Sequence, residues 1–269
     1  MYSAIPQLFI VYSCFFSTLI GNFLYYLTLS AAIKLAAAPL PTLIIATLPV
    51  VIAVCSNLGA GKSFAWKSLA PSLVLIVAGL LFVNYDQLQR LTHADSTGNL
   101  SQYLMGAALA WIAVAAWTWY PIHNARWLQK HTQHWSMTWA SAQGLVTLPI
   151  AAIGFTVMIA YYEFTNHPAF GFTQLGDAPA RFWMLMLAIG FSASWLGTLL
   201  WNVASKKTPT ALTGQLIVFE TLAALGYAYL VYSRAPSVYE AAGIALLVIG
   251  VIVGVRTFSR ASAPPNAEH

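Results

Sequence analysis

Apolar residues occur in eight long runs separated by short polar segments. The runs cover about residues 7–30, 39–56, 68–85, 102–122, 135–162, 181–203, 211–232 and 238–256. An α-helix of about 20 residues, rising 1.5 Å per residue, crosses a hydrocarbon layer of about 30 Å. The runs are continuous and do not alternate apolar with polar positions, as the strands of a membrane barrel do. The pattern therefore predicts an all-α membrane protein with about eight transmembrane helices.

Composition supports a membrane protein. Hydrophobic residues make up 59% of the 269 residues, and charged residues only 7%, against about 25% charged in a soluble domain. These proportions exclude an ordinary soluble enzyme, a disordered chain and a nucleic-acid-binding protein. Both cysteines, Cys14 and Cys55, lie in apolar runs, which argues against a disulfide framework and a zinc site. We expect no metal and no cofactor.

The positions of Lys and Arg predict an orientation in the membrane, because cytoplasmic loops carry an excess of these residues. With the N-terminus in the cytoplasm, eight fall inside and four outside. The inner eight are Lys62, Lys67, Arg126, Lys130, Lys206, Lys207, Arg256 and Arg260, and the outer four are Lys34, Arg90, Arg181 and Arg234. The split predicts a multi-pass protein with both termini cytoplasmic. Lys34, taken alone, favours the opposite orientation for the first span.

The chain contains an internal repeat. Residues 22–52 and 194–224 share a pattern at an offset of 172, which places Lys34 on Lys206, and a third helix follows at an offset of 171, which places Gly79 on Gly250. The predicted orientation puts Lys34 outside and Lys206 inside, so the two copies face opposite ways. Such an inverted repeat is typical of secondary transporters.

The second copy has two further helices, 102–122 and 135–162, whose counterparts would precede Met1. We therefore expect eight spans of a five-plus-five design, with two N-terminal helices absent. The predicted divisions are an incomplete first repeat of three helices at 1–96, a second repeat of five helices at 97–258, and a disordered cytoplasmic tail at 259–269.

Residues 21–57 and 195–232 resemble the third and fourth, and the eighth and ninth, helices of the EamA-type drug/metabolite transporter superfamily. Each stretch has an aromatic-rich helix, a turn, and a helix with a Pro or polar group at mid-membrane. Pro49 matches the expected Pro, whereas the second copy has Thr221 there, beside Glu220. The resemblance covers about residues 7–256. It implies a five-plus-five inverted-repeat fold, a central cavity, alternating access, and export or exchange of amino-acid-like or drug-like metabolites across a bacterial inner membrane.

Glu220 is expected to be the only acid inside a predicted span. An ionisable residue within a span is by default a candidate for a functional site. It could carry protons or bind a substrate amine, or it could be a protonated group hydrogen-bonded between helices. Pro49 could be a gating kink for alternating access or a static kink.

Six other side chains are candidates for a substrate pathway. Polar groups can contact substrate or bridge helices, and deep aromatic rings can line a cavity or pack. These candidates are Gln215, Asn202, Asn22, Tyr26, Trp139 and Trp195. Tyr25 is another deep aromatic residue, and Trp117 is assigned to the interfacial belt.

The sequence predicts a secondary transporter rather than an enzyme, because no catalytic pair falls within the spans. Its expected partners are a small-molecule substrate, protons and the lipid bilayer, but no nucleic acid. A homodimer could restore wall area lost with two helices. The alternative is a non-transporting structural or assembly subunit that keeps the fold.

Overall fold

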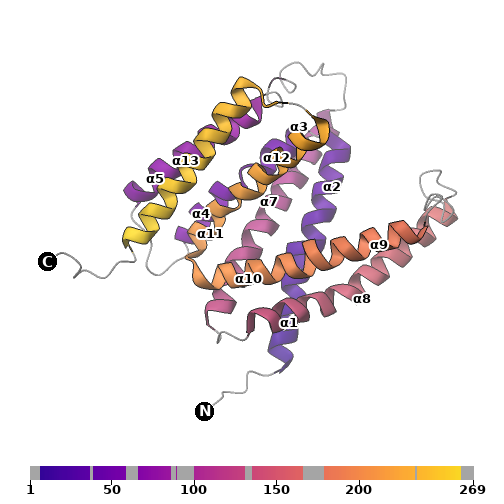
Figure 1. Cartoon of the computed structure of the whole chain (residues 1–269). Coiled ribbons are helices and arrows are strands. Elements are labelled where there is room, and N and C mark those ends of the chain that lie inside the picture. The colour runs from indigo at the N-terminus through magenta and orange to yellow at the C-terminus, as the bar shows by residue number, and fades with distance from the viewer. Residues whose placement is uncertain are drawn as a thin grey trace, which may run out of the picture. The chain divides into compact units, whose positions relative to one another are not determined.

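In a computed structural model of the chain, the described residues are 7–36, 39–58, 66–85, 89, 100–130, 135–165, 179–233 and 235–261. All elements in this part are helices (Figure 1). They are α1 (Gln7–Thr18), η1 (Leu19–Leu24), α2 (Tyr25–Ala36), α3 (Pro39–Ile45), α4 (Leu48–Leu58), α5 (Trp66–Val83), α7 (Leu100–Gln129), α8 (Trp135–Phe164), α9 (Pro179–Ile189), η3 (Gly190–Leu196), α10 (Gly197–Lys207), α11 (Thr210–Leu216), α12 (Val218–Tyr232) and α13 (Val238–Ala261).

The predicted eight spans are confirmed within the described residues. Eight helical stretches are long and apolar enough to cross a membrane: Tyr12–Ala36, Leu40–Leu58, Trp66–Val83, Leu100–Gln129, Trp135–Tyr161, Ala180–Lys207, Thr210–Tyr232 and Val238–Phe258. Their ends differ by a few residues from the apolar runs. Helix α13 continues to Ala261, past the predicted start of the tail at residue 259, and residues 262–269 lie outside the described part.

One span is broken next to Pro49. Helix α3 ends at Ile45 and α4 begins at Leu48, with Pro49 buried in the first turn of α4. A proline has no N–H, so Pro49 cannot bond the carbonyl of Ile45, four residues before it. The hydroxyl of Thr47 donates a 2.6 Å hydrogen bond to the carbonyl of Ile44, which satisfies one group at the break. The helix is therefore interrupted immediately before Pro49, and a kink that gates transport stays a prediction.

The sequence repeat is also a repeat of helix breaks. A π-helix, η1, precedes α2, and a second π-helix, η3, precedes α10 at an offset of 171 to 172 residues. Next, the break between α3 and α4 matches the break at Ile217 between α11 and α12. Helices α5 and α13 follow at the same offset. The two stretches thus share an irregular pattern of π-helix, helix, break and helix, which apolar composition alone does not produce.

The described residues divide into two compact units, each made of two separate stretches. The first unit joins the chain up to Leu19 with Arg126–Lys206, and the second joins Ile20–Ala125 with Lys207 onward. The predicted division between residues 96 and 97 separates the two repeat copies, not two compact units, and it stays a prediction.

In the first unit, helix α1 packs on α8. The rings of Trp127 and Trp139 stack with their centroids 3.5 Å apart, and Cys14 of α1 is buried in the same cluster. This cluster fixes α1 and the end of α7 on the first half of α8.

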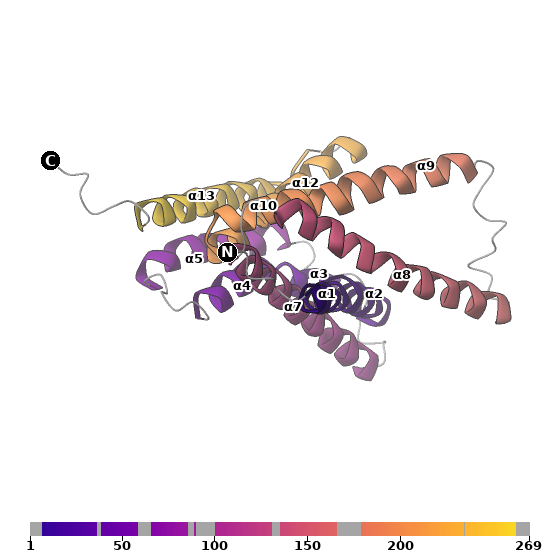
Figure 2. The same cartoon turned by 90° about the horizontal axis from the view of Figure 1, so that it is seen from below.

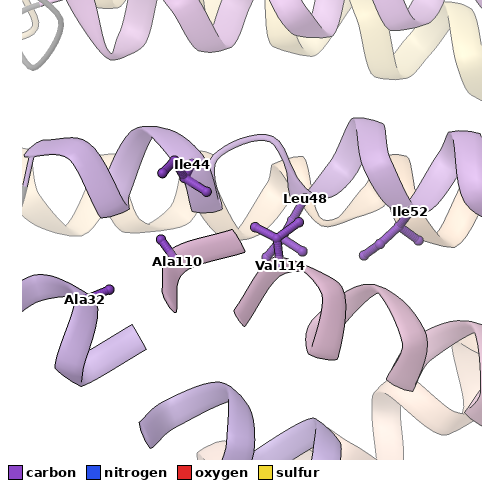
Figure 3. Close-up of a cluster of buried hydrophobic side chains, with 6 residues drawn as sticks. All are labelled: Ala32, Ile44, Leu48, Ile52, Ala110 and Val114. Carbon is purple, nitrogen blue, oxygen red and sulfur yellow. The ribbon is translucent and has the colours of Figure 1, made fainter. Parts of the chain in front are cut away.

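In the second unit, small and branched residues let α2, α3, α4 and α7 approach closely. Their shared core is shown in Figure 3 and consists of Ala32, Ile44, Leu48, Ile52, Ala110 and Val114. Gly106 of α7 lies so close to Ala36 of α2 that any added Cβ would overlap it. Trp117 of α7 and Ile217, at the break before α12, pack against the same core.

Helices α5 and α13 lie side by side in the second unit (Figure 1 and Figure 2). Gly79 of α5 lies against Leu247 of α13, because a Cβ added to Gly79 would come within 2.7 Å of the Leu247 side chain. Gly250 of α13 likewise lies against Ile76 of α5. At the repeat offset of 171, Gly79 corresponds to Gly250 and Ile76 to Leu247. If each residue is replaced by its counterpart in the other repeat copy, the Gly79–Leu247 contact therefore becomes the Gly250–Ile76 contact.

A second pair of contacts follows the same rule. Gly243 lies against the backbone of Val83, and Gly254 lies against the hydroxyl of Ser72. Adding 171 to 72 gives 243, and adding 171 to 83 gives 254. In all four contacts the residue number rises on α5 as it falls on α13, so the helices are antiparallel. Equivalent helices that cross antiparallel about a local two-fold axis are the signature of an inverted repeat.

Candidate functional site

Glu220 lies at a helix start inside the span Thr210–Tyr232. It is in the first turn of α12, and its backbone N–H donates a 2.9 Å hydrogen bond to the carbonyl of Ile217 at the break. The side chain is exposed and, among the described residues, takes part in no hydrogen bond or ion pair. The described contacts therefore leave the carboxylate open to a proton or ligand.

A row of three aromatic rings lies in the same unit as Glu220. The ring centroids of Tyr25, on α2, and Trp117, on α7, are 4.9 Å apart at an angle of 30°. Trp117 stacks in turn on Tyr120 at 5.4 Å. Gly21 makes room for this row, since a Cβ there would lie 2.6 Å from the Tyr120 ring. The π-helix η1, which contains Gly21, ends immediately before Tyr25, and such segments often occur at functional sites.

Glu220 lies in the same unit as Tyr25 and Trp117. Ile217, one turn before Glu220, packs against the core that also receives Trp117. The second unit thus contains an exposed carboxylate at the start of α12 and a row of rings on α2 and α7.

Tyr26 lies beside Tyr25. Its ring meets that of Tyr25 edge-on at 5.0 Å, and its side chain is 60% exposed. Asn22 is half-buried in η1, one turn before Tyr26. Sequence reasoning proposed Tyr26 and Asn22 and noted Tyr25. Trp117 was expected in the interfacial belt because it lies near the end of the predicted span 102–122, but α7 continues to Gln129.

Gln215 is fully buried at the end of α11. The Ser72 hydroxyl donates to Gln215 Oε1 at 3.1 Å and lies 2.8 Å from the carbonyl of Gly250. The Nε2 group of Gln215 has no hydrogen-bond partner among the described residues. Gln215 thus joins α11 to α5 and α13 in a buried polar contact, five residues from Glu220.

The other predicted residues lie in the first unit. Asn202 is fully buried on α10, and Trp139 is fully buried in its stack on Trp127. Trp195, in η3, is half-buried, and its Nε1 donates a 3.2 Å hydrogen bond to the hydroxyl of Ser141. Their predicted substrate role remains untested, but Trp139 and Trp195 have well-defined packing partners.

The prediction that Glu220 is the only acid within a span is wrong, because Glu240 lies within the span Val238–Phe258. Glu240 is 7% exposed, and its Oε2 accepts a 2.8 Å hydrogen bond from the backbone N–H of Ser237. The Ser237 hydroxyl accepts a 3.2 Å bond from the Glu240 N–H. This reciprocal pair is a capping box, and the sequence Ser-x-x-Glu before an apolar run would have revealed it.

The described residues hold no group of three His, Cys, Asp or Glu side chains arranged to bind a metal ion. Among the described residues of the second unit, Glu220 is the exposed carboxylate.

Comparisons with known proteins add one relative and one fold. No family model matches the chain. The chain is 44% identical over 242 residues to "Inner membrane protein YtfF" of Escherichia coli strain K12, covering 89% of this chain and 74% of that protein. A solved structure titled "Crystal structure of protein" superposes with a TM-score of 0.68 and 17% identity, covering 97% of this chain and 91% of its own. The likeness to this solved structure shows a shared fold.

Proposed function

Because the chain belongs to the family of the Escherichia coli inner membrane protein YtfF, we propose that it is a secondary transporter of the bacterial inner membrane. It exports or exchanges small metabolites by alternating access and couples this to proton movement through Glu220. It is not an enzyme. Its resemblance to the EamA-type drug/metabolite transporters is part of this proposal.

The observation that carries the proposal is the antiparallel, two-fold contact between α5 and α13. The helices are equivalent members of the two repeat copies, and the Gly79–Leu247 contact has its exchange-related mate in Gly250–Ile76. Copies that cross the membrane in opposite directions are a recurrent basis for alternating access, because exchanging their conformations opens the opposite side. A purely structural subunit has no comparable need for inverted copies.

The broken spans support the same function. Backbone within a membrane stays irregular only where it packs inside the protein or lines a cavity. The break beside Pro49 recurs at Ile217 in the other copy, and Glu220 begins the helix after it. Both breaks are suited to be bending points, so Pro49 acts as a gating kink. Half-helix starts are also where transporters commonly bind charged groups.

Substrate and protons share one path in this proposal. Glu220 binds the proton or the substrate, and Tyr26, Asn22 and Gln215 line the path near it. Asn202, Trp139 and Trp195 are proposed as further substrate contacts, with packing as the alternative role of Trp139. Both termini face the cytoplasm, and two copies associate as a homodimer.

The decisive test is flux. The chain is overexpressed in a bacterial host, alongside Glu220→Gln and an empty vector, and exported metabolites are quantified by mass spectrometry. A metabolite enriched outside wild-type cells is then loaded into proteoliposomes, and its efflux is followed with and without a pH gradient. We expect gradient-dependent efflux that Glu220→Gln abolishes at equal expression. A monodisperse protein that moves no enriched metabolite would overturn the proposal in favour of a non-transporting subunit.

A further inference from the structure

We propose that the last turns of α7 and α10 form a binding site for a phosphate group, which in the membrane is that of an anionic phospholipid. The inference goes beyond transport, because lipid binding can be measured without any flux. The site uses residues of the first unit alone.

One hydrogen bond holds the two helix ends together. The Nε2 group of Gln129, the last residue of α7, donates a 3.1 Å bond to the backbone carbonyl of Ser205 on α10. The spans Leu100–Gln129 and Ala180–Lys207 both end here. The site therefore lies where two spans leave the hydrocarbon layer and enter the region of the lipid head groups.

The end of α10 holds three buried hydrogen-bond donors that have no acceptor among the described residues. They are the ammonium group of Lys206, the hydroxyl of Ser205 and the indole N–H of Trp201. Ser205 is fully buried. It lies one turn after Trp201 and next to Lys206, so the three donors share one side of the helix. Buried donors, and a buried ammonium above all, are costly without a partner, and an anion with several acceptor oxygens would supply one.

The other repeat copy provides an internal comparison. Lys34 occupies the equivalent position, 172 residues before Lys206. The Lys34 side chain is exposed, as expected for a lysine that only marks a helix end. Lys206 instead has a buried ammonium group on a partly exposed side chain, and its flexible stem lets that group turn towards a ligand at the surface. The two lysines thus share a repeat position but not an environment.

The charge around the joined helix ends is positive. Arg126 and Lys130 are exposed in the last turn of α7 and just after it. The ring of Trp135, at the start of α8, meets that of Trp127 with centroids 5.9 Å apart, so α8 begins at this end. Glu163 is the acid in the described part of this unit, and it lies 28 residues after Trp135, about 42 Å along α8. No acid among these described residues therefore competes for the cations.

A phosphate group matches this arrangement. Its oxygens can accept hydrogen bonds from several donors at once, and its charge is attracted by lysine and arginine. The predicted orientation places this end in the cytoplasm, where anionic head groups gather at clusters of Lys and Arg close to a span. A lipid whose head group has no net charge would gain the hydrogen bonds but lose much of the charge attraction.

The lipid arm of the test is native mass spectrometry of the purified full chain in detergent, titrated with dioleoylphosphatidylglycerol. Dioleoylphosphatidylcholine keeps the phosphate but adds a trimethylammonium group, so it is the ligand control. We expect one tightly retained phosphatidylglycerol and weaker binding of phosphatidylcholine. Lys206→Gln should weaken phosphatidylglycerol binding about fivefold, and Lys206→Arg should retain it. Lys34→Gln removes the equivalent lysine of the other copy and should change nothing.

A second measurement separates loss of binding from loss of folding. Lys206→Gln removes a buried, unpaired ammonium group, so its apparent melting temperature in lipid-free detergent should equal or exceed that of the wild type. Phosphatidylglycerol should then raise the melting temperature of the wild type more than that of the variant. Lys130→Gln changes an exposed side chain and should also weaken lipid binding, by up to about fivefold, without affecting stability.

The soluble arm is equilibrium dialysis of the same protein against radiolabelled inorganic phosphate. Saturable phosphate binding that Lys206→Gln weakens, with no retention of phosphatidylglycerol, would keep the phosphate site and overturn the lipid as its source. Phosphatidylglycerol binding that Lys206→Gln leaves unchanged, or no binding of either probe, would overturn the inference.

Discussion

The Ser72 hydroxyl donates a hydrogen bond to Gln215 Oε1 at 3.1 Å, and both side chains are fully buried. Ser72 belongs to the first repeat copy, through α5, and Gln215 to the second, through α11. The same hydroxyl lies 2.8 Å from the carbonyl of Gly250 on α13. Gly254 leaves space for this contact, because an added Cβ would overlap the Gln215 side chain. One polar contact thus ties the two copies together.

Ser72→Ala should destabilise the protein, because Gln215 would keep a buried, unpaired carbonyl oxygen. We expect a loss of about 1–3 kcal/mol, seen as a lower apparent melting temperature in detergent. Ser30→Ala, which alters an exposed serine of α2, is the matched control and should change nothing. Equal melting curves for the two variants would contradict a stabilising role for the Ser72–Gln215 bond.

Gly243→Ala should separate α5 from α13. A Cβ at Gly243 would lie 2.7 Å from the backbone nitrogen of Val83 and 2.8 Å from the Gly79 carbonyl oxygen. Neither backbone atom can move without shifting a helix, so we expect a cost of about 1–3 kcal/mol and a smaller monodisperse fraction on size exclusion. Gly226→Ala is the control, because nothing lies within 4 Å of its added Cβ. If both variants elute alike, the close approach at Gly243 is incorrect.

The antiparallel alignment predicts which cysteines can be joined. With Cys14 and Cys55 replaced by serine, Ile76→Cys with Gly250→Cys should form a disulfide within one chain under mild oxidation in membranes. Val83→Cys with Gly254→Cys should not form a disulfide. Val83 lies against Gly243, which is 11 residues, or about 16 Å at 1.5 Å per residue, from Gly254. Electrophoresis after cleavage at an engineered site between the helices reads the result. Cross-linking of the second pair but not the first would rule out the antiparallel register.

The fold could be predicted from the sequence because a membrane span has a strong local signal. Each span can be recognised from its length and apolar composition. The helix break at Pro49 follows from the missing backbone N–H of proline. The repeat was visible because Lys34 and Lys206 mark equivalent turns. The contact of Gly79 with Leu247 could not be foreseen, because small residues favour close packing without naming the partner helix.

The site was predictable only in part. Glu220 stands out because an acid within a span is rare. Trp117 lies 92 positions from Tyr25, and only the packing of α2 on α7 brings their rings together. Glu240 differs from Trp117, because its Ser-x-x-Glu pattern at the start of the span 238–256 is a local signal that the sequence contains.

Trp139 should act through packing. It is fully buried and stacks on Trp127 in the first unit, so Trp139→Leu should leave a cavity and cost about 3 kcal/mol. The matched change Trp183→Leu alters a Trp that is 51% exposed and should be neutral. Melting curves and the KM for transport separate the roles. A raised KM at unchanged stability would instead make Trp139 a substrate contact, as the sequence also allowed.

The two acids within spans should respond oppositely to substitution. Glu240→Leu removes the acceptor for the Ser237 N–H and should cost about 1 kcal/mol of stability, while the surviving protein keeps its pH-driven flux. Glu240→Gln keeps an acceptor oxygen and should restore most of that stability. Glu220→Gln breaks no hydrogen bond among the described residues, so its melting temperature should equal that of the wild type while pH-driven flux disappears. The prediction is checked by measuring melting and flux on the same preparations. A Glu220→Gln protein that loses stability along with flux would make Glu220 a structural group, and the proton path would then have to run elsewhere.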